Sequence, residues 1–172
     1  MTLKMKSKLL ILSVLLSSVC MTGCGVYSFT GTTLSPDLKT IYIENFSMAT
    51  AGAPQNLSLT FNEDLKEYYQ RNTNLKIVPN DGDLLLSGAI TRYEMTPLAT
   101  TAGDKAAMNR LTIGIEVSFY NSQNEAENFD KEFSFYGDFS QEQSLSDVEP
   151  TLVPKILEQI VLDIFNETAA QW

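Results

Sequence analysis

Cys24 is the residue of this chain with the clearest chemical role. It follows the small residues of the segment 21–23, and an apolar run over 9–19, with lysines before it, lies upstream. That run is too short to cross ~30 Å of hydrocarbon as a permanent helix, but it is typical of a secretory signal. A cysteine directly after small residues resembles the lipobox, where lipid is attached to the thiol and cleavage leaves the cysteine first. We therefore predict lipidation at Cys24, with ordinary secretion and a free thiol as the alternative.

The charge of the mature chain supports a lipid anchor. The signal over 1–23 holds three of the 12 lysine and arginine residues and none of the 21 acidic residues, so the mature chain carries 9 basic side chains and a net charge of −12. This charge excludes a basic stripe for nucleic acid and argues against electrostatic adhesion to an anionic membrane. Acyl chains can hold such a protein instead, because each buried methylene contributes ~0.8 kcal/mol.

The residue types needed for common catalytic and metal sites are missing from the sequence. The chain has no histidine, and its two cysteines are Cys24 and Cys20, which lies inside the signal. Histidine is the commonest general base and metal ligand, so we predict no enzyme activity, no metal and no other cofactor. Residues 80–83 lack the spacing and the closing glutamate of a calcium loop. They predict a turn in which Gly82 takes a positive φ.

A predicted loop over residues 94–109 has the strongest signs of a binding function. Its 16 residues show no periodicity, and connections of that length inside a compact domain are often functional. Arg92, Lys105 and Arg110 lie at its base and within it, which gathers positive charge in an acidic chain. Because arginine forks suit phosphate, we predict these three as ligand-binding or partner-binding residues. The alternative is a solvated loop.

Two helices are expected to position this loop. Leu57, Phe61, Leu65 and Tyr69 recur at a spacing of four and predict one amphipathic helix. The last segment carries two adjacent apolar rows that predict a broad buried face: Leu152, Ile156, Ile160 and Ile164, and Val153, Leu157, Val161 and Phe165. A cap at Thr151 would place Pro154 in the first turn, whereas a start near Ser146 would predict a kink at Pro154.

Alternating apolar and polar residues predict the strands. The expected strands cover 40–44, 75–78, 83–93, 110–120 and 129–139, and the last two are expected to form an antiparallel hairpin. In 110–120 the odd-numbered residues are apolar and the even-numbered ones are mostly polar, which predicts one buried and one wetted face. Phe133 and Phe135 are expected inward, and strict alternation places Arg92 on the face of Leu86 and Ile90.

The order strand, helix, strands, helix predicts an α+β fold. We expect two helices packed on one face of a mainly antiparallel or mixed sheet of four to five strands, with the other face polar. The expected boundaries are a signal peptide over 1–23, a lipidated tether over 24–38 and a single domain over 39–172, a size that suits one core.

Several short motifs in this order resemble one known family. Cys24-Gly25-Val26-Tyr27-Ser28-Phe29-Thr30-Gly31 follows the signal, Asn109-Arg110-Leu111-Thr112-Ile113 opens a strand, and Asp163-Ile164-Phe165-Asn166 precedes Trp172. The chain thus resembles the LptE family of lipopolysaccharide-assembly lipoproteins over its mature length. The resemblance implies a fold of two helices against a sheet, in agreement with the prediction above.

The resemblance also implies a place and a role. Family members sit at the inner leaflet of the outer membrane, on its periplasmic face. They plug a large β-barrel protein, LptD, help it to assemble, and can bind lipopolysaccharide through basic residues on the sheet side. By position, Arg92 and Arg110 match those residues best here, with Lys105 third. The net negative charge of this chain fits the binding of lipopolysaccharide less well than it fits the plug role. The alternative function is a free-standing periplasmic lipoprotein that binds a ligand or activates a cell-wall enzyme.

Overall fold

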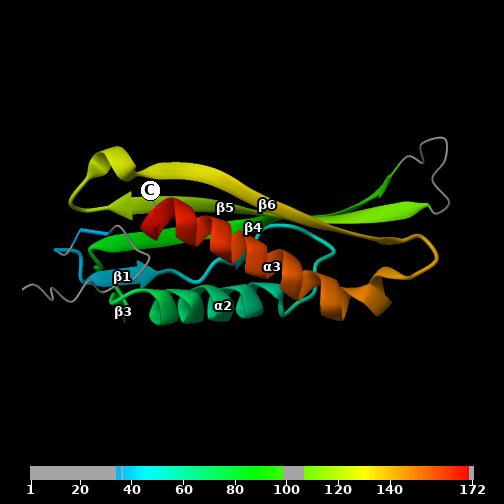
Figure 1. Cartoon of the computed structure of the whole chain (residues 1–172), viewed down its shortest axis with the longest axis horizontal. Coiled ribbons are helices and arrows are strands. Elements are labelled where there is room, and N and C mark those ends of the chain that lie inside the picture. The colour runs from blue at the N-terminus through cyan, green and yellow to red at the C-terminus, as the bar shows by residue number, and fades with distance from the viewer. Residues whose placement is uncertain (1–33, 36, 99–106, 171–172) are drawn as a thin grey trace, which may run out of the picture. The chain divides into compact units, whose positions relative to one another are not determined.

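The computed structural model describes residues 34–35, 37–98 and 107–170, which contain a mixed sheet and two α-helices (Figure 1). The strands are β1 (Thr40–Ile43), β2 (Ser47–Met48), β3 (Lys76–Val78), β4 (Leu84–Leu98), β5 (Met108–Asn121) and β6 (Phe129–Ser140). The helices are α2 (Leu57–Asn72) and α3 (Leu145–Ala169), and the short 3-10 helix η1 (Glu125–Glu127) joins β5 to β6.

The sheet has the strand order β3-β1-β4-β5-β6, and β2 pairs with β4 beyond the end of β1. Strand β1 runs parallel to both β3 and β4, whereas β4, β5 and β6 are antiparallel neighbours. Both helices lie on the same side of this sheet (Figure 1). The α+β prediction is therefore confirmed, and the two-residue β2 brings the sheet to six strands.

One apolar core fills the space between the helices and the inner face of the sheet. The predicted stripe of α2 is buried, with Leu57, Phe61, Leu65 and Tyr69 each at most 1% exposed. Both predicted rows of α3 face the same core, and of their residues Leu152 is only partly buried. The inward residues of β5 are buried as predicted, so the helical and strand periodicities of the sequence point to the same interior.

Helix α3 begins earlier than a cap at Thr151 would allow. It starts at Leu145 after Ser144, and both Pro150 and Pro154 lie inside it. A proline inside a helix removes a backbone hydrogen bond and is costly. The first turns nevertheless pack Leu145 and Val148 against the core, which favours the longer helix. The start near Ser146 is thus the better of the two expectations.

Two polar side chains hold the parallel part of the sheet. The Asp83 carboxylate accepts hydrogen bonds from the backbone N–H of Lys39 and of Thr40, both 2.9 Å, and from the Thr40 hydroxyl at 2.8 Å. Buried Asn62 of α2 accepts from the Phe46 N–H at 2.8 Å and donates to its carbonyl at 3.2 Å, where the chain passes from β1 to β2. These bonds replace sheet pairing where the ladder starts and where it is interrupted.

One local prediction is wrong, and a second holds only in direction. The positive φ of the 80–83 turn belongs to Asp81, at 52°, and not to Gly82. A Cβ at Gly82 would lie 2.5 Å from the backbone nitrogen of Tyr42, so this glycine is needed for a close approach instead. Phe135 opposes Ile113 and faces inward as predicted, yet it is 37% exposed, because β6 is the edge strand of the sheet that the described residues form.

Candidate functional site on the outer face of β4, β5 and β6

Both described ends of the predicted loop over 94–109 are largely strand. Strand β4 continues to Leu98, β5 begins at Met108, and the two stay paired from Glu94 opposite Thr112 to Leu98 opposite Met108. The loop prediction is therefore wrong at both ends. Backbone pairing between the strands holds these residues although their side chains do not alternate. Lys105 lies outside the described residues, so its place beside the arginines stays a prediction.

A β-bulge in β4 decides which way Arg92 points. The pairing register with β5 shifts between Ile90 and Arg92, so Thr91 is an extra residue in β4. Before the bulge Ile90 faces the core, and after it Tyr93 opposes the inward Ile113. Arg92 opposes Gly114 on the outer face. The expectation that Arg92 shares a face with Ile90 is wrong because strict alternation fails at this point.

We call the outward side chains of β4, β5 and β6 the strand face. It carries two arginines and five carboxylates and therefore a local excess of three negative charges: Arg92 and Arg110, with Glu94, Glu116, Asp130, Glu132 and Asp138. Exposed tyrosines lie among them, Tyr120 at 44% and Tyr136 at 46% exposure. The helices cover the opposite side of the sheet (Figure 1). The strand face is thus the polar face that the sequence predicts, and it faces solvent.

The Arg92 guanidinium is engaged by a carboxylate two strands away. Its Nη2 lies 2.8 Å from Oε1 of Glu132 on β6, so the side chain crosses the whole width of β5. Gly114 makes this crossing possible, because a Cβ there would lie 2.4 Å from Oε1 of Glu132 and 3.0 Å from the Cβ of Arg92. Both partners are about two-fifths exposed, so a ligand could reach the pair from solvent.

Arg110 forms a bidentate pair with Asp138. Its Nε and Nη2 donate to the two carboxylate oxygens at 2.7 and 2.9 Å, and its Cζ lies 3.5 Å above the centre of the Tyr136 ring. The hydrogen bonds from Arg110 hold the pKa of Asp138 below its usual range, and they raise the pKa of Arg110. Planar forks of this kind are the strongest surface ion pairs and fix both side chains.

The structure brings Arg92 and Arg110 to one face but does not leave them open to an anion. Arg110 opposes Thr96, four residues along β4 from Arg92, and each guanidinium already contacts a carboxylate. A phosphate would have to displace Glu132 or Asp138 to bind there. Sequence reasoning missed both pairs, although the two acids lie at alternate positions of the predicted strand 129–139 and could have been assigned to the same outward row.

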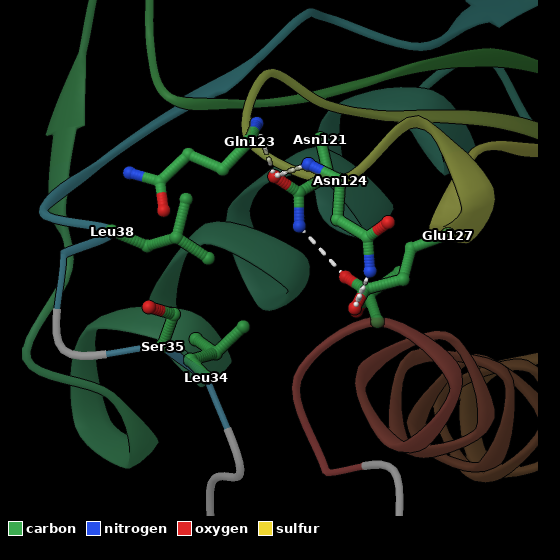
Figure 2. Close-up of a pocket in the computed structure, with 8 residues that line it drawn as sticks. Leu34, Ser35, Leu38, Asn121, Gln123, Asn124 and Glu127 are labelled. Atoms are coloured by element: carbon green, nitrogen blue, oxygen red, sulfur yellow. Dashed lines mark hydrogen bonds between the residues drawn. The ribbon is translucent and has the colours of Figure 1, made fainter.

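A pocket of about 360 Å³ lies at the other end of β5, beside the 121–127 turn (Figure 2). Glu127 accepts hydrogen bonds at 2.7 Å from the side-chain amides of both Asn121 and Asn124, and Asn121 accepts from the N–H of Gln123 at 2.9 Å (Figure 2). These hydrogen bonds stabilise the 121–127 turn and account for the asparagines in it. No described residue of the lining is basic, so the pocket does not complement an anion.

Within the described ranges, no group of acidic, cysteine or histidine side chains is arranged to hold a metal ion. No helix of these same residues is long and apolar enough to cross a membrane.

Comparisons with known proteins give a family and a fold. A model of the lipopolysaccharide-assembly family LptE matches residues 38–168. No curated protein matches the chain in sequence. Among solved structures, uncharacterized lipoprotein B from Nitrosomonas europaea is similar with a TM-score of 0.51 and 15% identity, over 74% of this chain and 79% of that one. A hypothetical protein from Chlamydia trachomatis has a TM-score of 0.50 and 10% identity, over 76% and 98%. At such identities the two structures show the fold alone.

Proposed function

The chain belongs to the LptE family of lipopolysaccharide-assembly lipoproteins, and from this premise we propose that it plugs and helps to assemble an LptD-like outer-membrane β-barrel. The family is non-enzymatic, so its members act through binding. The observation that carries the proposal is the extent of the match, because residues 38–168 include every described strand and nearly all of both helices.

The strand face supports a role as a binding subunit. Its tyrosines and arginines are residue types that are enriched where proteins meet. Its ion pairs are exposed and contribute little to folding, so the face is not needed for stability and can serve contact with a partner. We propose that Arg92 and Arg110 belong to the surface that meets the barrel, and that Lys105 extends it.

The anchor is a second part of the proposal. Cys24 lies outside the described residues, and its lipidation is supported by the small residues before it and by the acidity of the mature chain. A lipidated Cys24 would hold the domain at the periplasmic face of the outer membrane. Cys24→Ala should release the chain or leave the signal uncleaved, which fractionation of washed membranes and mass measurement would reveal. Mature Cys24→Ala protein that stays in the membrane would contradict this anchor.

Direct binding of lipopolysaccharide is the weaker part of the family's expected function for this chain. Lipopolysaccharide phosphates would compete with Glu132 and Asp138 for the two arginines, on a face with an excess of carboxylates. The excess of carboxylates on this face therefore favours contact with a protein partner over contact with lipid phosphate.

Co-purification tests the proposed function. The full chain, tagged at its C-terminus, is expressed in its own host, and the outer membrane is extracted in mild detergent. We expect the LptD-like barrel in stoichiometric amount after size-exclusion chromatography, identified by mass spectrometry. A second lipoprotein of the same membrane, tagged identically, controls for co-solubilised lipid. A monomeric chain without the barrel would instead favour a free-standing periplasmic lipoprotein.

A further inference from the structure

Glu116 stands in an unfavourable position on the strand face. It lies directly opposite Glu132 in the β5–β6 pairing, and both side chains point outward and are exposed. Like charges directly opposite one another destabilise an antiparallel pair. Arg92 compensates Glu132, but no described residue donates a hydrogen bond or forms an ion pair with the Glu116 side chain. Among the described residues, Glu116 thus keeps a carboxylate that no neighbouring side chain pairs with.

Glu94 repeats this pattern on the neighbouring strand. It follows Arg92 on the outward side of β4, it is exposed, and its carboxylate has no partner among the described residues. Both basic side chains of the strand face are already occupied, Arg92 by Glu132 and Arg110 by Asp138. Glu94 therefore lies between the register positions of the two arginines, and Glu116 lies opposite Glu132, both as carboxylates without a partner among the described residues.

We infer that the strand face docks onto a protein surface that carries lysine and arginine. The carboxylates of Glu94 and Glu116 form ion pairs with those side chains of the partner. In this arrangement Arg92 and Arg110 are positioning residues that hold Glu132 and Asp138 in place. The inference deepens the proposed function, on which it rests, because it takes the basic surface to be part of the barrel partner.

The charge of the face argues for this partner over lipid phosphate. An excess of three negative charges attracts a cationic surface and repels phosphate. The exposed Tyr136, held under the Arg110 guanidinium, adds the rigid aromatic contact that is common in protein interfaces. Relief of the repulsion between Glu116 and Glu132 would add to the binding free energy, since a partner cation would neutralise both.

The test measures the dissociation constant of the full chain for the purified barrel in detergent, at low and at high salt. Glu94→Gln with Glu116→Gln should weaken binding roughly three- to tenfold at low salt, and the difference should shrink at high salt, as expected for two exposed ion pairs. Glu94→Asp with Glu116→Asp keeps both charges and should retain most of the affinity. Glu63→Gln with Glu158→Gln makes the same change of charge on exposed positions of α2 and α3 and should have no effect.

Two further readouts separate docking from misfolding and from lipid binding. The melting temperature of the Glu94→Gln, Glu116→Gln variant should equal or exceed that of the unmodified chain, because the repulsion opposite Glu132 is gone. Its retention on lipopolysaccharide vesicles should not fall. Weaker lipopolysaccharide retention with unchanged barrel affinity would overturn the inference in favour of a lipid-binding face.

The outcomes also distinguish this inference from the proposed function. If the unmodified chain binds the barrel and the Gln variant binds equally well at low salt, the docking surface is wrong while the plug role stands. Equal weakening by the control variant would likewise overturn the docking surface. If the unmodified chain does not bind the barrel at any salt concentration, the proposed function and this inference fall together.

Discussion

The two faces of the β4–β5–β6 sheet are built from alternate residues of the same strands, yet they differ in every physical respect. The inward apolar residues of β5 from Leu111 to Phe119 are at most 4% exposed and belong to the core. The outward residues of the same strands form ion pairs whose side chains are 31–43% exposed. Apolar burial contributes about 25 cal/mol per Å², whereas exposed ion pairs contribute ~0–1 kcal/mol each. The inner face therefore determines stability, and the outer face is free to serve recognition.

The largest effect should come from a charge on the inner side. Ile160→Asp places a carboxylate at a fully buried position of α3, where an unpaired charge costs several kcal/mol, so we expect about 4 kcal/mol of destabilisation or more. Expression level and thermal melting measure this. Asn166→Asp adds the same carboxylate to an exposed position of the same helix and should melt normally. A normal melting curve for Ile160→Asp would show that α3 does not pack as described.

Removal of the buried Asn62 amide, which lies between the helices and the sheet, should have a smaller but still large effect on stability. Asn62→Ala removes both hydrogen bonds to the Phe46 backbone and leaves its buried N–H and carbonyl unpaired. We expect a loss of about 2–3 kcal/mol in the free energy of unfolding, measured with denaturant. Asn45→Ala, which removes an exposed hydrogen bond to Lys66, is the control and should cost less than about 0.5 kcal/mol. Equal costs would mean that Asn62 is not holding the β1–β2 passage.

Asp83 at the start of β4 should give an intermediate effect that depends on pH. Hydrogen bonds from the Lys39 N–H, then from Thr40, hold the pKa of Asp83 below its usual range. Its ionised form therefore stabilises the fold above an ordinary pKa of ~3.9, and this contribution is lost as the pH falls through the folded pKa. Asp83→Asn should cost about 1 kcal/mol near neutral pH and progressively less in acid. A cost that is the same at every pH would rule out the carboxylate's charge as the cause.

The smallest effect on stability should come from the outer face. Arg110→Gln should lower the free energy of unfolding least among these variants, and by still less in high salt, because the ion pair it removes is exposed and screened. A double-mutant cycle with Asp138→Asn isolates the coupling between the two side chains, whose pair is exposed by about a third. A coupling as large as the effect of Asn62→Ala would break the comparison, because the outer face would then be structural.

Sequence patterns predicted the fold well where they reflect burial. The α2 stripe, the two α3 rows and the alternation of β5 all mark side chains that must leave water, and each lies where it was expected. Parallel pairing of β1 with β4 leaves no comparable pattern in so short a strand. Phe135 is exposed because β6 is an edge strand, and the sequence does not specify the strand order.

The candidate site was harder to predict because its geometry depends on contacts between strands. Arg92 and Arg110 stood out by charge, and the structure places them on one face. Their partners Glu132 and Asp138 follow from the β5–β6 register, which a sequence does not specify. The length of β4 was underestimated since residues 94–98 lack alternation, so a paired segment had the composition of a loop.

The bulge at Thr91 shifts the alternation of inward and outward side chains in β4 by one residue. Deleting this single residue would remove the bulge and leave the segment 92–98 in its present register, because Arg92 would then follow Ile90 directly and still oppose Gly114. If Thr91 instead paired regularly, Arg92 would point into the apolar interior, and Tyr93 would leave the Glu149 carboxylate to which its hydroxyl donates. Related chains in which β4 is one residue shorter at this point should therefore keep the same polar and apolar pattern along 92–98. Chains that keep the length of β4 but pair regularly through position 91 should exchange polar and apolar residues along that segment.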